Sequence, residues 1–404
     1  MTFEELSIYM KEKEIPQYSR DNYDNFLKKV GFNFPIKSVH ITGTNGKGST
    51  ANYLSAIYQD AGLKVGRYTS PFLSQITENV AVNGKNISEE EYVSLFEEYK
   101  NLFEKYELTA FEMQTFIAFT YLTRQAVDLA IIEVGMGGFV DATNIITPEL
   151  SIITSVTLEH TAYLGRSVSE IAANKAGIIK ENKPVLIGKM DESAVFAIKE
   201  RAKYLDSELT IVEDFHNERV IDGKLHFDYY PLQNLVLSTA ALYQAKNASL
   251  AIEATKLLTS IKPVSEENIR NGLMTKTMNC RFEYIKPNII LDGGHNPEAI
   301  DDLVKTIQLS ENRPIHVVFA AFRDKNIDPM LISLQQISND ITLTTFNHKR
   351  ARTEEEYFLY LGDYKFQEDY KEVIKSLLEE YPDDVILVTG SLAFVGVVRE
   401  YLNV

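Results

Sequence analysis

A glycine-rich segment in the first part of the chain has the residue types of a phosphate-binding turn. It lies between a β-branched run, Ser38 to Thr42, and a helical pattern, Ala51 to Ala61. Its residues are Gly43, Thr44, Asn45, Gly46, Lys47, Gly48, Ser49 and Thr50. Backbone N–H groups and the helix dipole at such a turn favour phosphate. Lys47 would add positive charge and Ser49 or Thr50 a hydroxyl group for Mg²⁺, whereas the alternative is a flexible turn whose lysine faces solvent.

A carboxylate follows an apolar run, Asp128-Leu-Ala-Ile-Ile-Glu133. The run is typical of a central parallel strand, and its carboxyl end is where ligands of such sheets bind. We therefore expect Glu133 to lie near the glycine-rich turn. Burying a carboxylate without a partner is costly, so a metal ion or a basic neighbour is expected beside it.

Four other polar residues carry little information by themselves. His160 fits a loop or core histidine, and Lys175 fits a solvated helix residue. Asn247 fits a polar position in a helix that faces solvent, and Arg281 fits a surface ion pair. Any chemical role for these residues depends on their wider sequence context.

The surrounding sequence alternates between short apolar runs and helical segments, which is typical of parallel sheets covered by helices. Further strands are expected at Val65 to Thr69, Leu150 to Ser155, Val185 to Ile187, Ile289 to Asp292, Ile315 to Phe319, Ile341 to Phe346 and Val385 to Thr389. Antiparallel pairs are expected at the Asn83-Gly84 and Asp222-Gly223 turns. Thr2 with Glu5 and Ser88 with Glu91 predict helix starts.

The length of 404 residues predicts two domains. Lys286-Pro287-Asn288 is interpreted as a linker or as the early edge of a second domain. We expect an α/β fold in which residues 1–286 form a phosphate-loop domain with a central, mainly parallel sheet. Residues 287–404 are expected to form a smaller, Rossmann-like α/β domain.

The composition argues against several classes of protein. The net charge of −16 disfavours nucleic acid and anionic membrane as partners, so positive charge for an anionic substrate must be local. No stretch has the composition of a transmembrane span, and the first residues do not resemble a secretion signal. A single cysteine, Cys280, fits a reducing compartment. We expect a cytoplasmic monomer.

Several segments, taken in order, resemble the folylpolyglutamate synthase/dihydrofolate synthase branch of the Mur-ligase-like enzymes. The segment GTNGKGST is similar to that family's phosphate loop, although it lacks the general G-x-x-x-x-G-K-[ST] pattern. Further matching segments are TSPFLSQITENV, TAFE, EVGMGGFVDATN, ITSVTLEHTAYLG, KAGIIK, YQAKNASLAI, CRFE, DGGHNPEA, DKN and VTGSLAFVG. The resemblance covers Val39 to Val398, nearly the whole chain.

The resemblance implies two Mg²⁺ sites. One would use Ser49, Ser70 and Glu133, and the other Glu133, His160 and Lys175. Hydroxyl and carboxylate oxygens suit this ion, and one imidazole is tolerable. A protonated lysine cannot bind a cation, and the family carbamylates the lysine that Lys175 matches. Lys47, Glu133, His160 and Lys175 are thereby the expected catalytic set.

The resemblance also implies contacts to ATP and to a folate. Besides the phosphate loop, Asn247 would contact the adenine side, Arg281 the phosphates and Asp292 the ribose. The folate contacts would come from Thr109, Ala110, Phe111, Glu112, Val140, Asp141 and Ala142. Two positions depart from the family pattern: Phe139 stands where many relatives have arginine, and Asn279-Cys280 where Pro-Gly is common.

The implied activity is ATP-dependent addition of L-glutamate to a folate carboxylate through an acyl phosphate. Whether dihydropteroate is also a substrate stays open. One alternative is a peptidoglycan Mur ligase, which shares the chemistry but uses a UDP-linked acid. Another is a non-catalytic, nucleotide-dependent binding protein, which would need the phosphate loop but neither Lys175 nor an amino-acid site.

Overall fold

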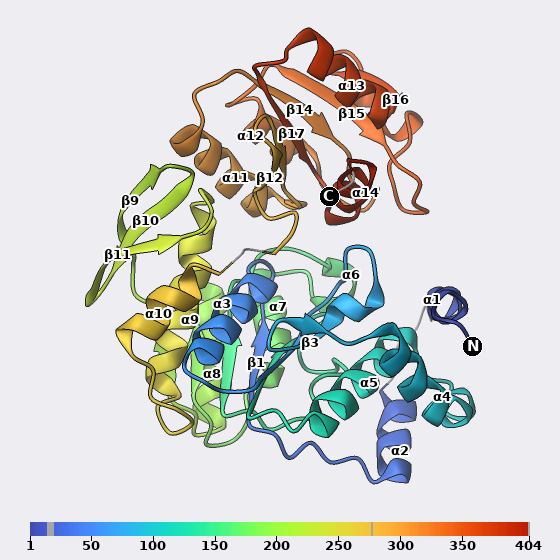
Figure 1. Ribbon diagram of the computed structural model, residues 1–404, viewed down its shortest axis with the longest axis vertical. Coiled ribbons are helices and arrows are strands. Elements are labelled where there is room, and N and C mark those ends of the chain that lie inside the picture. Colours follow the sequence, from blue (N-terminus) through green and yellow to red (C-terminus); the bar gives the residue numbers. More distant parts are fainter. Residues whose placement is uncertain (14–19, 276–277, 403–404) are drawn as a thin grey trace. The chain divides into compact units, whose positions relative to one another are not determined.

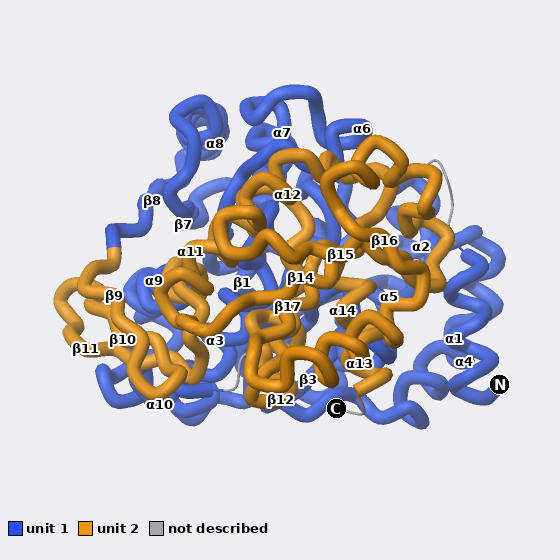
Figure 2. The backbone as a smooth tube through the Cα atoms, turned by 90° about the horizontal axis from the view of Figure 1, so that it is seen from above, with its two compact units in different colours: residues 1–214, 247–275 blue, residues 215–246, 276–404 orange. Residues whose placement is uncertain are grey.

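The chain folds into two compact units, each built from two separate segments of the sequence. The structure, a computed structural model, describes residues 1–13, 20–275 and 278–402. Unit 1 comprises residues 1–214 and 247–275, and unit 2 comprises residues 215–246 and 276–404 (Figure 2). Among the described residues, no helix is both long and apolar enough to cross a membrane.

Unit 1 contains a large, mainly parallel sheet, in which β1 and β3 are labelled in Figure 1. The strand order is β4-β3-β2-β5-β1-β6-β7-β8. Its strands are β1 (Ser38–Thr42), β2 (Val65–Tyr68), β3 (Val80–Val82), β4 (Lys85–Asn86), β5 (Leu129–Glu133), β6 (Leu150–Ile153), β7 (Val185–Ile187) and β8 (Leu209–Ile211). The antiparallel pairs are β2 with β3 and β3 with β4. Strands β1 and β5 are buried along their whole length, as expected of central strands covered on both faces.

Helices pack around this sheet. They are α1 (Phe3–Glu12), α2 (Asp21–Val30), α3 (Lys47–Asp60), α4 (Glu89–Lys105), α5 (Ala110–Arg124), α6 (Thr161–Leu164), α7 (Val168–Lys175), α8 (Glu192–Tyr204) and α10 (Glu266–Leu273), with 3₁₀ turns η1 (Ile76–Asn79) and η2 (Ala176–Ile178). The predicted capping boxes of α1 and α4 are confirmed. Phe26 of α2 packs edge-on against Phe116 of α5, within an apolar core that also includes Phe103 of α4.

Unit 2 contains a sheet in the order β12-β13-β17-β14-β15-β16, parallel except for β12. The strands are β12 (Glu283–Lys286), β13 (Ile289–Leu291), β14 (Ile315–Phe319), β15 (Asp340–Thr345), β16 (Lys365–Asp369) and β17 (Val385–Thr389). The helices are α11 (Pro297–Ser310), α12 (Asp328–Leu334), α13 (Tyr370–Glu380) and α14 (Leu392–Tyr401), with η3 (Glu355–Tyr360). The fold class is therefore confirmed: an α/β phosphate-loop domain and a second parallel-rich α/β domain.

A small antiparallel sheet, in the order β11-β10-β9, belongs to unit 2. Its strands are β9 (His216–Ile221), β10 (Lys224–Tyr229) and β11 (Leu232–Leu237). The predicted Asp222-Gly223 turn joins β9 and β10, and both turn residues have positive φ. The third strand was not predicted. Helix α9 (Tyr243–Leu257) follows this sheet and carries the chain from unit 2 into unit 1.

Two sequence predictions differ from the structure in detail. The first helix after the phosphate loop begins at Lys47 rather than Ala51, so the loop's last residues form a helical turn. Lys286-Pro287-Asn288 is not a linker, because it connects the paired strands β12 and β13 inside unit 2. The boundary between residues 286 and 287 stays a functional prediction, while the compact units divide the chain elsewhere.

Candidate active site

The phosphate loop presents backbone N–H groups because α3 starts inside it. Gly46 precedes the helix with φ +86°, a left-handed conformation that glycine adopts without strain. The first N–H groups of a helix have no partner within the helix. The N–H groups of Lys47 and Gly48, at the start of α3, are therefore suited to an anion, and phosphate binding by the segment Gly43 to Thr50 stays a prediction.

The neighbouring segment after β6 holds this loop in place. The N–H of Thr44 donates to the carbonyl of Ser155 at 2.9 Å, and the N–H of Asn45 donates to the Ser155 hydroxyl at 2.9 Å. The Thr154 hydroxyl donates to the carbonyl of Asn45 at 2.5 Å. A methyl group added at Gly43 would lie 1.9 Å from Oγ1 of Thr154. Sequence reasoning assigned no role to Thr154 or Ser155, although both lie in the matching segment ITSVTLEHTAYLG.

Lys47 and Asn247 both lie at the loop. Nζ of Lys47 donates to the carbonyl of Gly43 at 3.0 Å, which folds its charge back over the turn. A methyl group added at Gly46 would lie 2.2 Å from Oδ1 of Asn247. Asn247 is 6% exposed, so it is not the solvent-facing helix residue of the alternative interpretation. Its contact with the adenine side of ATP stays a prediction.

Glu133 lies at the end of β5, beside β1, and is buried. Its Oε2 accepts the backbone N–H of Ser70 at 3.3 Å, so two predicted metal ligands are neighbours. Burial lowers the pKa of the Arg67 guanidinium, and the negative charge of nearby Glu133 opposes that lowering. Arg67 is therefore a basic neighbour of the kind that a buried carboxylate needs. The sequence prediction left the identity of this partner open.

Lys175 ends α7 and is 3% exposed. Burial, and then the positive charge of Lys47, lower the pKa of the Lys175 ammonium to about 7. The negative charges of Glu159 and Asp141 act in the opposite direction. The alternative interpretation of Lys175 as a solvated helix residue is thus wrong. Glu159 is a neighbouring charge that sequence reasoning missed.

His160 is more exposed than the other predicted metal ligands. Its side chain is 42% exposed, and its Nε2 lies 4.0 Å from Oε1 of Glu159. The backbone has φ +51°, before the short helix α6. Within residues 1–13, 20–275 and 278–402, no three His, Cys, Asp or Glu side chains are grouped closely enough to hold a metal ion. The predicted set includes only two such residues, Glu133 and His160, so its metal role stays a prediction.

The predicted folate segments contain residues with clear structural contacts. Thr109 and Glu112 form a capping box at the start of α5, with the Thr109 hydroxyl 2.9 Å from Oε2 of Glu112. Ala142 is buried in the apolar core of unit 1. Asp141 is also buried, and it accepts the N–H of Met136 at 2.9 Å. These contacts explain their positions without a ligand.

Phe111 and Val140 remain the better placed candidates for folate contact. The Phe111 ring lies against Gly135, where an added methyl group would be 2.3 Å from the ring. Val140 is 49% exposed, and Phe139 beside it is 60% exposed. Ala110 begins α5 next to Phe111. Their roles in folate binding stay predictions.

In unit 2, Asp292 follows β13 and is engaged by the protein itself. Its Oδ2 accepts the Tyr243 hydroxyl at 2.6 Å and the N–H of Phe282 at 2.9 Å, and its Oδ1 accepts the N–H of Gly294 at 2.8 Å. Burial raises the pKa of the Asp292 carboxyl, although these bonds and the charge of Arg281 oppose that rise. The predicted ribose contact would have to be made alongside these bonds.

The segment that carries Arg281 keeps a backbone suited to glycine. Cys280 has φ +58° and Phe282 has φ +52°, both in the left-handed region. Glycine is common in the family at the position of Cys280, and the cysteine keeps the left-handed backbone that glycine adopts without strain. Arg281 is near Asp292, as its effect on that carboxyl shows, and its contact with ATP phosphates stays a prediction. The imidazole Nδ1 of His295 lies 2.9 Å from the carbonyl of Gly293.

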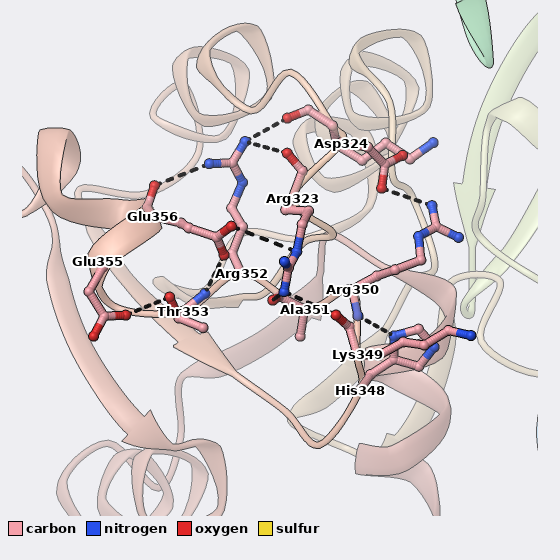
Figure 3. A network of polar contacts seen from close by, with 11 residues as sticks. Arg323, Asp324, His348, Lys349, Arg350, Ala351, Arg352, Thr353, Glu355 and Glu356 are labelled. Carbon is pink, nitrogen blue, oxygen red and sulfur yellow. Dashed lines mark hydrogen bonds and ion pairs between the residues drawn. The ribbon is translucent and has the colours of Figure 1, made fainter. Parts of the chain in front are cut away.

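Two loops of unit 2 are joined by a network of arginine contacts (Figure 3). They follow the adjacent strands β14 and β15 at the carboxyl edge of the sheet. Arg350 pairs with Asp324 at 2.8 Å, and Arg352 donates to the carbonyl of Lys325 at 2.8 Å. The N–H of Arg323 donates to the carbonyl of Arg350 at 2.9 Å. The matching segment DKN is thus held by its neighbouring loop.

Two family models match the chain and together span most of it. Residues 41–254 match the Mur ligase middle domain, and residues 280–392 match the Mur ligase, glutamate ligase domain. A dihydrofolate synthase/folylpolyglutamate synthase of Bacillus subtilis is 32% identical over 390 residues, with 91% of each chain covered. A folylpolyglutamate synthase of Lacticaseibacillus casei is 31% identical over 385 residues, covering 90% of this chain and 89% of the relative.

A solved structure extends the similarity to the tertiary fold. The chain of E. coli FolC in complex with DHPP and ADP superposes with a TM-score of 0.89 at 29% identity. The similarity covers 100% of this chain and 98% of that one. The matching domains, the identity over nearly the whole length and the shared fold lead to one conclusion: the chain belongs to the folylpolyglutamate synthase/dihydrofolate synthase members of the Mur ligase family.

Proposed function

We propose that this protein joins L-glutamate to the carboxylate of a folate, at the expense of ATP. The observation that carries the proposal is the grouping in unit 1 of a clamped phosphate loop, the buried carboxylate of Glu133 and the buried amine of Lys175. Relatives that are 31% and 32% identical over 90% and 91% of this chain are a folylpolyglutamate synthase and a dihydrofolate synthase/folylpolyglutamate synthase. A tetrahydrofolate is the expected acceptor, and dihydropteroate is a second candidate.

The reaction has two steps. The folate carboxylate attacks the γ-phosphorus of ATP, which forms an acyl phosphate and releases ADP. The amine of glutamate then attacks the acyl carbon, the amide forms, and phosphate and one proton leave. The loop N–H groups and the ammonium of Lys47 stabilise charge on the transferring phosphoryl oxygens, a preorganised electrostatic effect.

The donor set fits one Mg²⁺ as it stands, and a second only if Lys175 is modified. Glu133, Ser49 and Ser70 offer oxygen ligands and His160 an imidazole, all of which suit this ion, whereas an ammonium repels it. When bound, Mg²⁺ would neutralise charge on the phosphate oxygens. We propose that Ser49, Ser70 and Glu133 hold one ion, and that Glu133, His160 and a carbamate on Lys175 hold a second. The lowered pKa of Lys175 supports this modification, because carbon dioxide reacts with neutral amines.

We also propose that the protein works as a monomer in the cytoplasm. The single cysteine, Cys280, is buried, and burial raises the pKa of its thiol to about 12. Such a thiol is a poor nucleophile. Because Cys280 forms no disulfide, the fold does not depend on an oxidising compartment.

The test is a product assay with the purified protein, ATP, Mg²⁺ and L-glutamate. Tetrahydrofolate, dihydropteroate and a UDP-linked acid are supplied in separate reactions, and the masses of the products are measured by mass spectrometry. We expect ADP release that depends on glutamate and a product one glutamyl unit heavier. ADP release without a new amide would refute ligation and favour a nucleotide-dependent binding protein. Turnover only with a UDP-linked acid would favour a peptidoglycan ligase.

A further inference from the structure

Two polar side chains lie on the same face of the buried central strand β1. Side chains alternate along a strand, so His40 and Thr42 point to one face, while Val39 and Ile41 point to the other. All four are fully buried, and a buried polar group is costly without a hydrogen bond. Both polar residues contact the segment after β5: the Thr42 hydroxyl donates to the carbonyl of Gly137 at 2.5 Å, and Nε2 of His40 lies 2.9 Å from Oγ1 of Thr143.

The contacts of Thr143 fix the direction of these hydrogen bonds. Its hydroxyl lies 2.5 Å from Oδ1 of Asp141, and the same oxygen accepts the N–H of Thr143 at 2.9 Å. A carboxylate only accepts, so the single hydroxyl proton goes to Asp141. The hydroxyl oxygen must then accept a proton from Nε2 of His40. This chain of bonds assigns the proton of the ring to Nε2.

The remaining ring nitrogen agrees with this assignment. Nδ1 of His40 is buried and has no hydrogen-bond partner in the part of the chain that the structure describes. Burial, and then the positive charge of Lys180, lower the pKa of the imidazole to about 3. The ring is therefore neutral near pH 7 and serves as a donor to Thr143 alone.

The bonds lead from His40 to the segment that borders Lys175. Asp141 accepts the N–H of Met136, and the N–H of Phe139 donates to the carbonyl of Asn174 at 3.1 Å. A methyl group added at Gly138 would lie 2.7 Å from the carbonyl oxygen of Lys175. The segment 135–141 is thus fixed from β1 on one side and rests against the end of α7 on the other.

We propose that His40 is a positioning residue for the ligation reaction: by donating to Thr143 it holds Asp141, and with it the segment 135–141 that borders Lys175. The proposal rests on the proposed function, because it concerns the efficiency of that reaction. His40 itself is buried in the sheet and contacts no substrate.

Paired substitutions test the donor without changing the apolar volume greatly. In His40→Gln, an amide N–H replaces the Nε2–H, whereas His40→Leu removes the donor. We expect His40→Leu to lower kcat/KM for the folate substrate at least tenfold and His40→Gln to stay within threefold of the native protein. Affinity for a non-hydrolysable ATP analogue, measured by calorimetry, should change less than twofold, because Thr154 and Ser155 hold the phosphate loop independently. Equal activity of the two variants would overturn the proposal.

A second pair acts on the other end of the bond. Thr143→Ser keeps the hydroxyl and Thr143→Val removes it, so only Thr143→Val should lose activity. In the double variant His40→Leu/Thr143→Val, the loss in kcat/KM should not exceed that of the worse single variant. Losses that multiply would show that the two residues act separately and would refute the relay. This pair also decides the question if His40→Leu does not fold.

A spectroscopic measurement does not depend on turnover. In protein labelled with ¹⁵N in its imidazoles, the His40 signal, assigned by its absence in His40→Gln, should show a proton on Nε2 and no titration between pH 5 and 8. A proton on Nδ1, or titration in this range, would overturn the proposal. If the native protein makes no amide product while this signature holds, the proposed function fails and the hydrogen-bond assignment stands.

Discussion

Lys47 and Lys175 carry the same side chain in different environments. Lys47 is half-buried at the first turn of α3, and its ammonium bonds to loop carbonyls, from which it can turn to a phosphate. Lys175 is buried at the end of α7, where burial and the charge of Lys47 favour its neutral form. One lysine thus supplies positive charge, and the other supplies an amine that can be modified.

Replacement of Lys47 by alanine should leave the fold intact and reduce activity strongly. The side chain is half-buried with its ammonium at loop carbonyls, and its charge would compensate the phosphoryl oxygens in the transition state. We expect kcat/KM to fall about 100-fold or more, in line with the loss of one preorganised electrostatic contact. Steady-state kinetics at saturating ATP check this, with circular dichroism as the control for folding. Near-native turnover would remove Lys47 from the catalytic set.

Carbamylation of Lys175 should increase with pH. Carbon dioxide reacts with the neutral amine, and with a pKa of about 7 this form is the minor one at pH 6 and the major one at pH 8. At a fixed pressure of ¹³C-labelled carbon dioxide, the carbamate signal in NMR spectra should grow over this range. Lys175→Ala should abolish both the signal and the activity.

Lys180 provides the matched control for this measurement. Burial lowers its pKa to about 8, and its Nζ bonds to Oδ1 of Asn144 at 2.8 Å. Lys180→Arg should keep the carbamate signal. A signal that survives in Lys175→Ala and disappears in Lys180→Arg would show that Lys180 is the modified residue and that the prediction for Lys175 is wrong.

At the scale of elements, the phosphate loop combines a special backbone with close contacts. Gly46 has φ +86° and lies against Asn247, whereas Gly62, at the end of the same helix, has φ +87° and open space around its Cα. Substitutions at the two glycines can therefore distinguish the effect of backbone strain from the effect of crowding by a side chain. Substitution at either position costs the strain, and only Gly46 also meets a side chain.

Gly46→Ala should weaken binding of an ATP analogue at least tenfold, because the methyl group displaces Asn247 or shifts the loop. Gly62→Ala should lower the free energy of unfolding by about 1 kcal/mol, the cost of a left-handed non-glycine residue, and leave the affinity unchanged. Calorimetry and denaturant titration measure the two quantities. Equal affinities in the two variants would mean that the crowding at Gly46 has no effect on the site.

The start of α5 shows how a motif can be structural. Thr109 and Glu112 belong to a predicted folate segment, but the contacts between them are those of a helix cap. Thr109→Ala should lower the free energy of unfolding by about 1 kcal/mol, the usual effect of a lost N-cap, and Thr109→Ser should retain it. The KM for folate should be unchanged in both. A large rise in KM for Thr109→Ala without loss of stability would support direct folate contact instead.

At the scale of the whole molecule, the chain crosses between the two units more than once. Residues 215–246 contribute Tyr243 to the surroundings of Asp292, and Ala240 and Ala241 to the apolar core of unit 2. Strand β12 pairs with β13 although it precedes residue 287. A domain that begins at residue 287 would therefore lack part of its core and one edge of its sheet.

A fragment of residues 287–404 should unfold at least about 10 °C below unit 2 in the full protein, since an apolar core and a strand are worth several kcal/mol. Residues 215–246 joined by a flexible linker to residues 276–404 should recover most of the difference. Differential scanning calorimetry compares the three proteins. An equally stable short fragment would support the boundary between residues 286 and 287 as a folding boundary.

The sequence by itself determined the features that depend on neighbouring residues. Glycine-rich turns, capping pairs and apolar runs act within a few positions, so the phosphate loop, most strands and the α/β class could be predicted. The ordered motifs also identified the family. Strands β11 and β12 were missed because the two-residue turns that join them to β10 and β13, 230–231 and 287–288, lack the Asn-Gly or Asp-Gly pair that signals a hairpin.

Only the tertiary structure decided which distant residues complete the site. Ser155 holds Asn45 across 110 positions, and Thr143 meets His40 across 103. Arg67 balances Glu133 because β2 lies beside β5 in the sheet. Such contacts depend on strand order and on the direction of each side chain, and neither is encoded in local periodicity. The environment of Lys175 likewise follows from burial, which brings Lys47, Glu159 and Asp141 near one amine.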